Sequence, residues 1–359
     1  MPNAGITGWG KCLPPAILSN DDIATFLDTS DEWITTRTGI RQRRIAHTSL
    51  GEMAYVATQR ALTCAGLAGH DVELIVFGTT THDDQCPNMA SGLQQRIGAE
   101  GCAAMDVNTA CTSFLYGLST ASAMIKSGVV RNAVVVGGER ISPYMNWNDR
   151  NVAVLFGDGA AAVVLQATDD DSGVMLEKLG CYGDSRDILR IHGIGGTYVH
   201  QDRLTGVTEW QFEGQEIFKK AVTGMGQACE DVLQRAHKTP DDIDLVVPHQ
   251  ANLRIIEYVA KRAGVPMDRV HVNVDRYGNM SAATVPTALC EALEQGRVKP
   301  GSLLLMPAFG GGLTFCAHLV RWGERVTPID ISDIELPAAE LSALEMVQRY
   351  RQASGKRIE

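Results

Sequence analysis

Two hydrophobic patterns alternate along most of the chain. Short apolar runs typical of buried β-strands, such as residues 74–78 and 245–247, follow stretches whose apolar residues recur at helical spacing. One stretch, from Val107 to Ile125, contains no charged residue and joins the end of an alternating strand to a helix with an uncharged surface. Strands that alternate with helices predict parallel βαβ units and therefore an α/β fold.

Three segments of the first half recur in the same order in the second half. They are a helix that precedes a strand, a further helix, and a strand–turn–helix–strand unit. The early copies cover residues 53–78, 88–99 and 103–139, and the later copies cover 217–249, 252–265 and 269–312. Chance similarity between two α/β stretches is the alternative, but three matches in order favour an internal duplication. We expect two βαβ halves related by a pseudo-twofold axis.

A polar turn cluster at 167–173 lies between the two copies. It divides the chain into a first half, 1–170, and a second half, 171–322. Residues 323–359 form an extension, with a proline-containing linker and one predicted helix over 338–351 that has an apolar edge. We expect this helix to pack on the body of the protein or on a partner chain, and its pattern indicates no function.

Composition excludes several classes of protein. The chain is 45% hydrophobic and 21% charged, which suffices for a sizeable core. Its net charge of -10 argues against a nucleic-acid binder. The nine cysteines include no CxxC pair and no zinc-type spacing, so we expect no metal site and a reducing, cytoplasmic setting. We expect neither a signal peptide nor a membrane span, because the N-terminal residues lack a basic-then-apolar pattern and the charge-free stretch is rich in Ser, Thr, Asn and Gly.

Three polar residues lie at corresponding strand ends in the two halves. Cys111 precedes the charge-free helix, and His249 and Asn279 follow strands of the second copy. Ligands bind where the carboxyl ends of such strands open, and a thiol at a helix N-terminus ionises more easily. Taken singly, these residues also fit an inert cysteine, a surface histidine and an N-cap asparagine. The glycines at 310–312 permit close backbone approach and offer N–H groups to an anion.

Together these segments resemble the β-ketoacyl-acyl carrier protein synthase III family of the thiolase superfamily. The matching motifs occur in the family's order over about residues 1–322. They are SDEWITTRTGIRQRRI (30–45), DVNTACTSFLYGL (106–118), WNDRNVAVLFGDGAAA (147–162), PHQANLRII (248–256), DRYGNMSAATVP (275–286) and AFGGGLTF (308–315). The resemblance implies a thiolase-like duplicated fold with five layers, αβαβα.

The resemblance also implies a reaction. Cys111 would take a primer acyl group from a coenzyme A thioester, with the oxyanion held by the N–H groups of Cys111 and Gly311. His249 and Asn279 would donate hydrogen bonds to the thioester oxygen of malonyl-acyl carrier protein while it loses CO₂. The resulting carbanion attacks the acyl-cysteine, and the β-ketoacyl product initiates fatty-acid synthesis. Decarboxylation makes the nucleophile, so the reaction needs neither a general base for that step nor a tightly bound cofactor.

Binding residues follow from the same resemblance. The coenzyme A site is implied at Trp33, Arg37 and Arg150. The acyl channel is implied at Phe156, Gly214, Phe218 and Phe309. Acyl carrier protein docking is implied at Lys219, Arg254, Lys261 and Arg262. Cys86 stands where the family carries a phenylalanine that reaches the partner's acyl pocket, so the resemblance implies a homodimer. Because cysteine is smaller than phenylalanine, we expect the pocket to admit longer acyl groups.

Three other functions fit parts of the pattern. A sister condensing enzyme or acyltransferase of a specialised pathway would use the same three residues, with longer primers. A cysteine hydrolase would share the order Cys, His, Asn, but the papain-type context around the cysteine is missing. A catalytically silent partner subunit would be expected to lack the cysteine.

Overall fold

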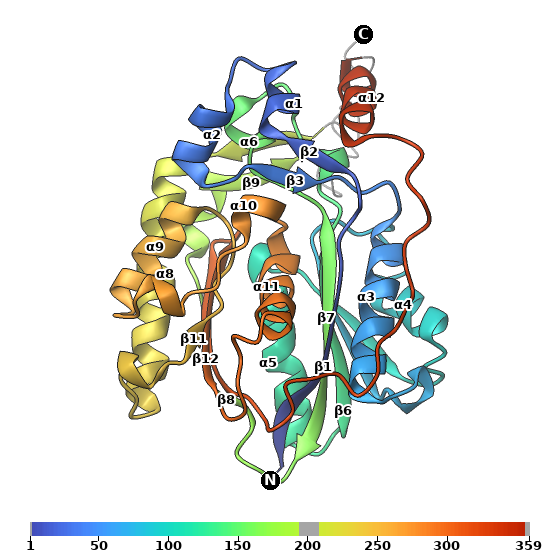
Figure 1. Cartoon of the computed structure of the whole chain (residues 1–359), viewed down its shortest axis with the longest axis vertical. Coiled ribbons are helices and arrows are strands. Elements are labelled where there is room, and N and C mark those ends of the chain that lie inside the picture. The colour runs from blue at the N-terminus through green and yellow to red at the C-terminus, as the bar shows by residue number, and fades with distance from the viewer. Residues whose placement is uncertain (1, 194–207, 356–359) are drawn as a thin grey trace.

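The computed structural model describes residues 2–193 and 208–355, which form two β-sheets with helices between and outside them (Figure 1). The five-stranded sheet has the order β1-β7-β6-β4-β5 and the four-stranded sheet the order β11-β12-β13-β8. The first comprises β1 (Asn3–Cys12), β7 (Gly159–Thr168), β6 (Asn132–Glu139), β4 (Leu74–Gly78) and β5 (Ala103–Val107). The second comprises β11 (Leu245–Val246), β12 (Leu303–Gly310), β13 (Thr314–Arg321) and β8 (Gly173–Cys181). Two small hairpin-like sheets pair β2 (Ile17–Ser19) with β3 (Gln42–Arg44), and β9 (Leu189–His192) with β10 (Glu209–Phe212).

The layers follow the order αβαβα, so the predicted fold is confirmed. Helices α5 (Ser113–Lys126) and α11 (Thr284–Glu294) lie between the two sheets, as Figure 1 shows. Outside the five-stranded sheet lie α3 (Leu50–Ala65) and α4 (Met89–Ile97), and outside the other lie α8 (Gly214–Arg235) and α9 (Leu253–Arg262). The central position explains the charge-free stretch, because a helix covered by a sheet on each side has no face for charged residues.

The two sheets repeat one strand order. β1, β7, β6 and β4 correspond to β8, β13, β12 and β11, and within each set of four the last pair is parallel while the others are antiparallel. Val270 forms a parallel bridge to Val246 at the place where β5 pairs with β4 in the first sheet. The predicted duplication is therefore visible strand by strand. The turn between β7 and β8 spans 169–172.

Short α-helices cover the end of the molecule above the central helices (Figure 1), and 3-10 helices are spread along the chain. The α-helical ones are α1 (Asn20–Ala24), α2 (Asp31–Thr38), α6 (Arg150–Ala153) and α10 (Val274–Tyr277). The 3-10 helices are η1 (Gly69–Asp71), η2 (Ala110–Thr112), η3 (Ser142–Tyr144), η4 (Gly183–Ile188), η5 (Pro240–Asp242), η6 (Met267–Arg269) and η7 (Ser281–Ala283). None of the helices in the described ranges is long and apolar enough to cross a membrane.

The extension returns along the first half and ends in α12 (Ala343–Gly355). Arg325 and Ile329 both hydrogen-bond the Cys64 carbonyl, at 2.9 and 3.0 Å. The helix begins later than predicted, because the Ser342 hydroxyl accepts a hydrogen bond from the Glu345 N–H at 3.3 Å and caps the first turn there. The extension is thus held by specific contacts along its length.

Candidate active site

Cys111 lies in η2, directly before the central helix α5. The preceding residue, Ala110, has a φ of 53°, a left-handed conformation that a non-glycine residue adopts at a cost. The end of β12 lies against this turn, since a Cβ added to Gly310 would come 2.7 Å from the Cys111 nitrogen. Only glycine fits at 310, and its neighbour Gly311 lines a cavity together with Cys111.

Burial raises the pKa of the Cys111 thiol to about 12. The negative charge of Glu139 raises this pKa further, whereas a hydrogen bond from Ser281 opposes the shift. The backbone N–H group of Cys111 at the start of the helix lowers the pKa, in the direction that the sequence predicts, but burial has the larger effect. The loss of water around the sulfur outweighs the field of the helix terminus.

His249 follows β11 and is almost fully buried, with 3% of its surface exposed. Its Nδ1 lies 2.6 Å from the Thr284 hydroxyl oxygen, which is also 2.9 Å from the Ser281 carbonyl oxygen. Burial lowers the pKa of His249 to about 3, so the ring is neutral near pH 7. Because one hydroxyl proton serves two acceptors, its direction decides which ring nitrogen of His249 carries the hydrogen.

Asn279 precedes η7, and its side-chain orientation is fixed by a neighbour. The Ser281 backbone N–H donates a hydrogen bond of 2.8 Å to Oδ1 of Asn279. Because this hydrogen bond holds Oδ1, the NH₂ group of Asn279 points away from the Ser281 backbone. The side chain lines a cavity that His249 and Cys111 also line. Asn279 therefore presents a hydrogen-bond donor to the same space as the thiol.

Glu139 is a buried carboxylate beside this group that sequence reasoning missed. It ends β6 with no exposed surface and accepts hydrogen bonds from Thr79, Thr80, Thr81 and, at 3.0 Å, Ser281. Burial raises the pKa of Glu139 to about 7, although these hydrogen bonds oppose the shift. The sequence feature that could have pointed to Glu139 is that it is the single acidic residue at the end of the apolar run VVVGGE.

Two cavities meet at Cys111. The first, of about 660 Å³, extends from Trp33 and Arg37 to Cys111, His249 and Asn279. The second, of about 530 Å³, has a mixed lining and shares Cys111, Phe156 and Leu189 with the first. Its other lining residues include Thr80, Thr81, His82, Gln85, Ile141, Tyr144, Arg186, Ile191 and Trp210. The thiol is therefore reached from two sides.

The residues predicted for the acyl channel divide between these cavities. Phe156 lines both, but Gly214, Phe218 and Phe309 line the first cavity, on the side of Trp33. The difference arises because the N-terminal part of α8, which carries Gly214 and Phe218, lies outside the four-stranded sheet and beside α9. Cys86 is exposed and is not among the described residues that line either cavity.

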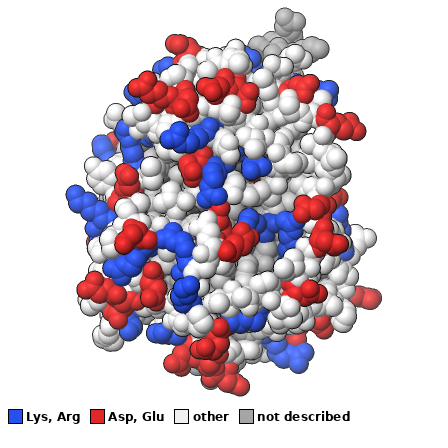
Figure 2. All heavy atoms as spheres, in the orientation of Figure 1, with Lys and Arg blue, Asp and Glu red and all other residues white. Residues whose placement is uncertain are grey.

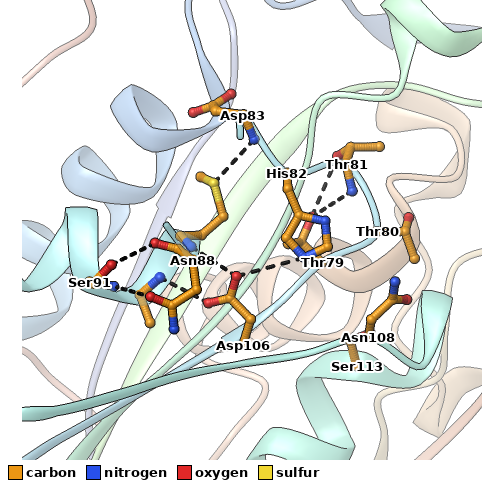
Figure 3. A network of polar contacts seen from close by, with 12 residues as sticks. Thr79, Thr80, Thr81, His82, Asp83, Asn88, Ser91, Asp106, Asn108 and Ser113 are labelled. Atoms are coloured by element: carbon orange, nitrogen blue, oxygen red, sulfur yellow. Dashed lines mark hydrogen bonds and ion pairs between the residues drawn. The ribbon is translucent and has the colours of Figure 1, made fainter. Parts of the chain in front are cut away.

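The loop after β4, which carries Cys86, is held by a polar network (Figure 3). Asp106 of β5 accepts hydrogen bonds from the backbone N–H groups of Met89 and Ala90, at 2.8 and 2.9 Å, at the start of α4. The His82 ring lies 3.7 Å from the same carboxylate and also lines the second cavity. The network therefore fixes one wall of that cavity.

Cationic groups gather on Trp33 at the outer end of the first cavity. The guanidinium groups of Arg37 and Arg150 lie 4.4 and 4.6 Å from the centre of its ring. Arg150 also donates a hydrogen bond of 2.8 Å to the Asp28 carbonyl. The three residues predicted to bind coenzyme A are thus adjacent, and such a site suits a flat ring and phosphates.

The four basic residues predicted to dock a carrier protein lie on α8 and α9. Arg254 donates to the Thr36 carbonyl at 2.9 Å, and Lys219 and Arg262 form ion pairs with Glu216 and Glu230. Lys261 is exposed in the last turn of α9. Figure 2 shows acidic and basic side chains interspersed on the face that carries α9.

Comparisons with known proteins decide the family. Models described as 3-oxoacyl-[acyl-carrier-protein (ACP)] synthase III and its C-terminal part match residues 105–183 and 233–322. A β-ketoacyl-[acyl-carrier-protein] synthase III 2 of Vibrio cholerae is 51% identical over 346 residues, covering 96% of each chain. The chain belongs to the β-ketoacyl-acyl carrier protein synthase III family. It is an acyltransferase of the condensing type.

Solved structures agree with this membership. The 3-oxoacyl-[acyl-carrier-protein] synthase III of Aquifex aeolicus is 41% identical, with a TM-score of 0.83, and the match covers 89% of this chain and all of that one. The priming β-ketosynthase of the R1128 polyketide pathway is 32% identical, with a TM-score of 0.85, and covers 90% of this chain and 97% of that one. Among the described residues, no group of three His, Cys, Asp or Glu side chains could hold a metal ion.

Proposed function

We propose that the enzyme loads a primer acyl group from a coenzyme A thioester onto Cys111 and condenses it with malonyl-acyl carrier protein. The product is β-ketoacyl-acyl carrier protein, which begins fatty-acid synthesis. One observation carries the proposal: Cys111 lies where two cavities meet, and His249 and Asn279 line the cavity that leads to Trp33. The reaction needs this arrangement because one cavity must hold the acyl group while the other admits two thioesters in turn.

The first cavity would hold the coenzyme A arm. Trp33 and Arg150 take the adenine between them, and Arg37 contacts the phosphates. The Arg150 guanidinium lies 4.6 Å from the centre of the Trp33 ring, which leaves no room for an adenine between them. The guanidinium must therefore move off the indole as the adenine enters. Phe218 and Phe309 then flank the pantetheine arm on its way to the thiol.

In the loading step the Cys111 sulfur attacks the thioester carbonyl and the carbon–sulfur bond to coenzyme A breaks. The negative oxygen of the intermediate accepts hydrogen bonds from the N–H groups of Cys111 and Gly311. The thiol proton ends on the coenzyme A sulfur, so the step is balanced. A neutral resting thiol fits this sequence, because the proton leaves only when the acyl carbon is in place.

In the condensation step malonyl-acyl carrier protein loses CO₂, and the electron pair of the broken bond spreads onto the thioester oxygen. Asn279 donates to that oxygen through its NH₂ group, and His249 donates through Nε2. The Nε2 hydrogen requires the Thr284 hydroxyl to donate to Nδ1, at 2.6 Å, rather than to the Ser281 carbonyl. The carbanion attacks the acyl-cysteine, and the Cys111 thiolate leaves and regains a proton.

The acyl group would occupy the second cavity. Cys86 of a partner subunit limits its depth, since we propose a homodimer in which the loop after β4 crosses to the other chain. The outer edge of β5 supports a dimer: among the described residues this edge strand pairs only with β4, and an unpaired edge is a ready pairing surface. Cys86→Phe should then shift the preference toward short acyl-CoA primers, and an unchanged acyl-CoA profile would remove Cys86 from the pocket.

The remaining partners and the setting follow the same proposal. The carrier protein docks on the basic residues of α8 and α9, of which Lys261 is the freest to make a new contact because Arg254, Lys219 and Arg262 already have protein partners. The enzyme works in the cytoplasm with no tightly bound cofactor. A priming role in a specialised pathway is the second candidate, favoured by the similarity to the R1128 polyketide enzyme.

Intact mass spectrometry after exposure to a panel of acyl-CoA thioesters tests the proposal. We expect one acyl group per chain in the wild type and none in Cys111→Ser. Cys102→Ser, a partly buried cysteine nine residues earlier, is the matched control and should load normally. Acylation that persists in Cys111→Ser would overturn the assignment of the nucleophile, and the preferred primer separates the two candidate pathways.

A further inference from the structure

The C-terminal helix α12 contacts both segments that carry the Trp33–Arg150 pair. We infer that Arg351 of α12 is a positioning residue for coenzyme A binding, and that the extension acts as a brace for the adenine end of the site. The inference rests on the proposed function, because it concerns how that site is held. Neither the reaction nor the family match assigns a role to residues 323–359.

Arg351 joins two parts of the chain that are distant in sequence. Its Nε donates a hydrogen bond of 3.2 Å to Oδ1 of Asn148, and its guanidinium lies 4.7 Å from the centre of the Phe26 ring. Phe26 lies in the segment between α1 and α2, and Asn148 lies in the loop before α6. One side chain therefore ties these two segments together.

Both segments continue directly to the adenine site. Asn148 is two residues before Arg150, whose guanidinium contacts the Trp33 ring at 4.6 Å. Phe26 is two residues before Asp28, whose carbonyl accepts the hydrogen bond from Arg150 at 2.8 Å. A bond between Arg351 and Asn148 thus restrains the loop from which Arg150 must move off Trp33 and return onto the adenine.

The helix that carries Arg351 is itself anchored. Ala343, Met346 and Val347 of α12 are 1%, 6% and 0% exposed and belong to the hydrophobic cluster that includes Ile23, Ile34 and Trp147. Figure 1 shows α12 at the end of the molecule that carries α1 and β2. A rigidly seated helix makes the Arg351 contacts effective, because a restraint needs a fixed point on the protein body.

The extension lies outside residues 105–183 and 233–322, which the family models match. The Aquifex aeolicus structure is covered completely by a match that leaves 11% of this chain aside, whereas the Vibrio cholerae relative matches 346 of the 359 residues. The second match necessarily includes most of residues 323–359. The Vibrio cholerae relative therefore shares residues of the extension.

Acylation of Cys111 by two primers with the same acyl group tests the inference. One primer is the coenzyme A thioester and the other is the N-acetylcysteamine thioester, which lacks the nucleotide and cannot reach Trp33. Arg351→Ala should raise KM for the coenzyme A thioester by about three- to tenfold, the scale of a hydrogen bond plus a cation–π contact. Its KM for the N-acetylcysteamine thioester and kcat with both primers should match the wild type.

Matched variants sharpen the test. Arg349→Ala removes an exposed arginine of the same helix and should leave both KM values unchanged. Asn148→Ala should reproduce the part of the effect that the hydrogen bond to Arg351 supplies, and the double variant should be no worse than Arg351→Ala, because the Asn148 contact is already lost there. Equal losses with both primers, or no change with either, would overturn the inference. Failure of the proposed function is distinct from these outcomes, because the wild type itself would then carry no acyl group on Cys111.

Discussion

The turns that precede the two central helices have similar backbone conformations but different side chains. Before α5 the left-handed residue is Ala110, with a φ of 53°, and Cys111 follows it; before α11 it is Ser281, with a φ of 48°, two residues after Asn279. The backbone of the first turn packs closely against Gly310 of β12, whereas Ser281 of the second turn bonds both Asn279 and Glu139. Duplication therefore preserved a strained turn, and in our proposal the nucleophile belongs to the first turn and the charge-stabilising groups to the second.

The largest test of this division uses the second turn. Asn279→Asp keeps the size of the side chain but removes its donor, so malonyl decarboxylation should fall by about 10²- to 10³-fold, the scale for one lost oxyanion donor. Acylation of Cys111 should fall much less, because in our proposal its oxyanion is held by the backbone N–H groups of Cys111 and of Gly311, the residue after β12. Separate rates of ¹⁴CO₂ release and of acyl loading measure both steps, for Asn279→Asp and for His249→Ala. Equal losses in the two steps would break the comparison.

Glu139 gives the second test, through pH. Its pKa is raised to about 7 in the folded protein from 4.5, so the folded state binds the proton more tightly than the unfolded state. Stability is then fullest below pH 4.5 and is lost as pH rises toward 7, by an amount on the order of 3 kcal/mol. Glu139→Gln should remove this loss, measured as the difference in urea unfolding free energy between pH 5 and pH 8. Glu257→Gln, on the exposed side of α9, is the control and should keep the wild-type slope.

Substituting glycine for each strained residue compares the turns directly. Ala110→Gly should change the unfolding free energy by less than about 1 kcal/mol, because relief of the left-handed strain offsets the greater freedom of the unfolded chain. Ser281→Gly relieves similar strain but removes a donor to the buried Glu139, and should destabilise by about 1–3 kcal/mol. Urea denaturation measures both. If Ala110→Gly lowered the unfolding free energy more than Ser281→Gly, the hydrogen bond from Ser281 to Glu139 would not be the main difference between the two turns.

The smallest expected effect concerns the outer surface. Lys261→Glu should raise KM for malonyl-acyl carrier protein by a few-fold at low salt, with the difference fading as salt screens the exposed charge. Loading from a coenzyme A thioester should be unaffected. Lys299→Glu, exposed after α11, makes the same charge change elsewhere and is expected to leave KM unchanged.

The fold was accessible from sequence because its signals are local. Uncharged helices, apolar strands and three repeated segments each occupy a continuous stretch, so the duplication could be inferred before any contact was known. Cys111, His249 and Asn279 could be singled out because each stands at a strand end inside a distinctive motif, and the structure brings them to one cavity. The start of α12 was misplaced because a cap at Ser342, rather than the apolar pattern, sets it.

The polar surroundings of the site could not be predicted in the same way. Glu139 and Ser281 are 142 residues apart, and nothing near either one indicates the other. The sequence also could not assign Phe218 and Phe309 to one cavity or the other: they are apolar residues on different elements, and only the folded chain decides on which side of Cys111 they lie. The raised pKa of the thiol likewise depends on how much water the surrounding layers exclude.

The placement of α11 has a consequence for how the protein unfolds. Every residue from Thr284 to Leu293 is buried, and the cluster around this helix includes Phe114 and Leu118 of α5 as well as strands of both sheets. Neither half can therefore cover its own central helix. We infer that hydrogen exchange at the amides of α5 and α11 occurs only through global opening, so that the two halves, although copies of one unit, form a single cooperative unit.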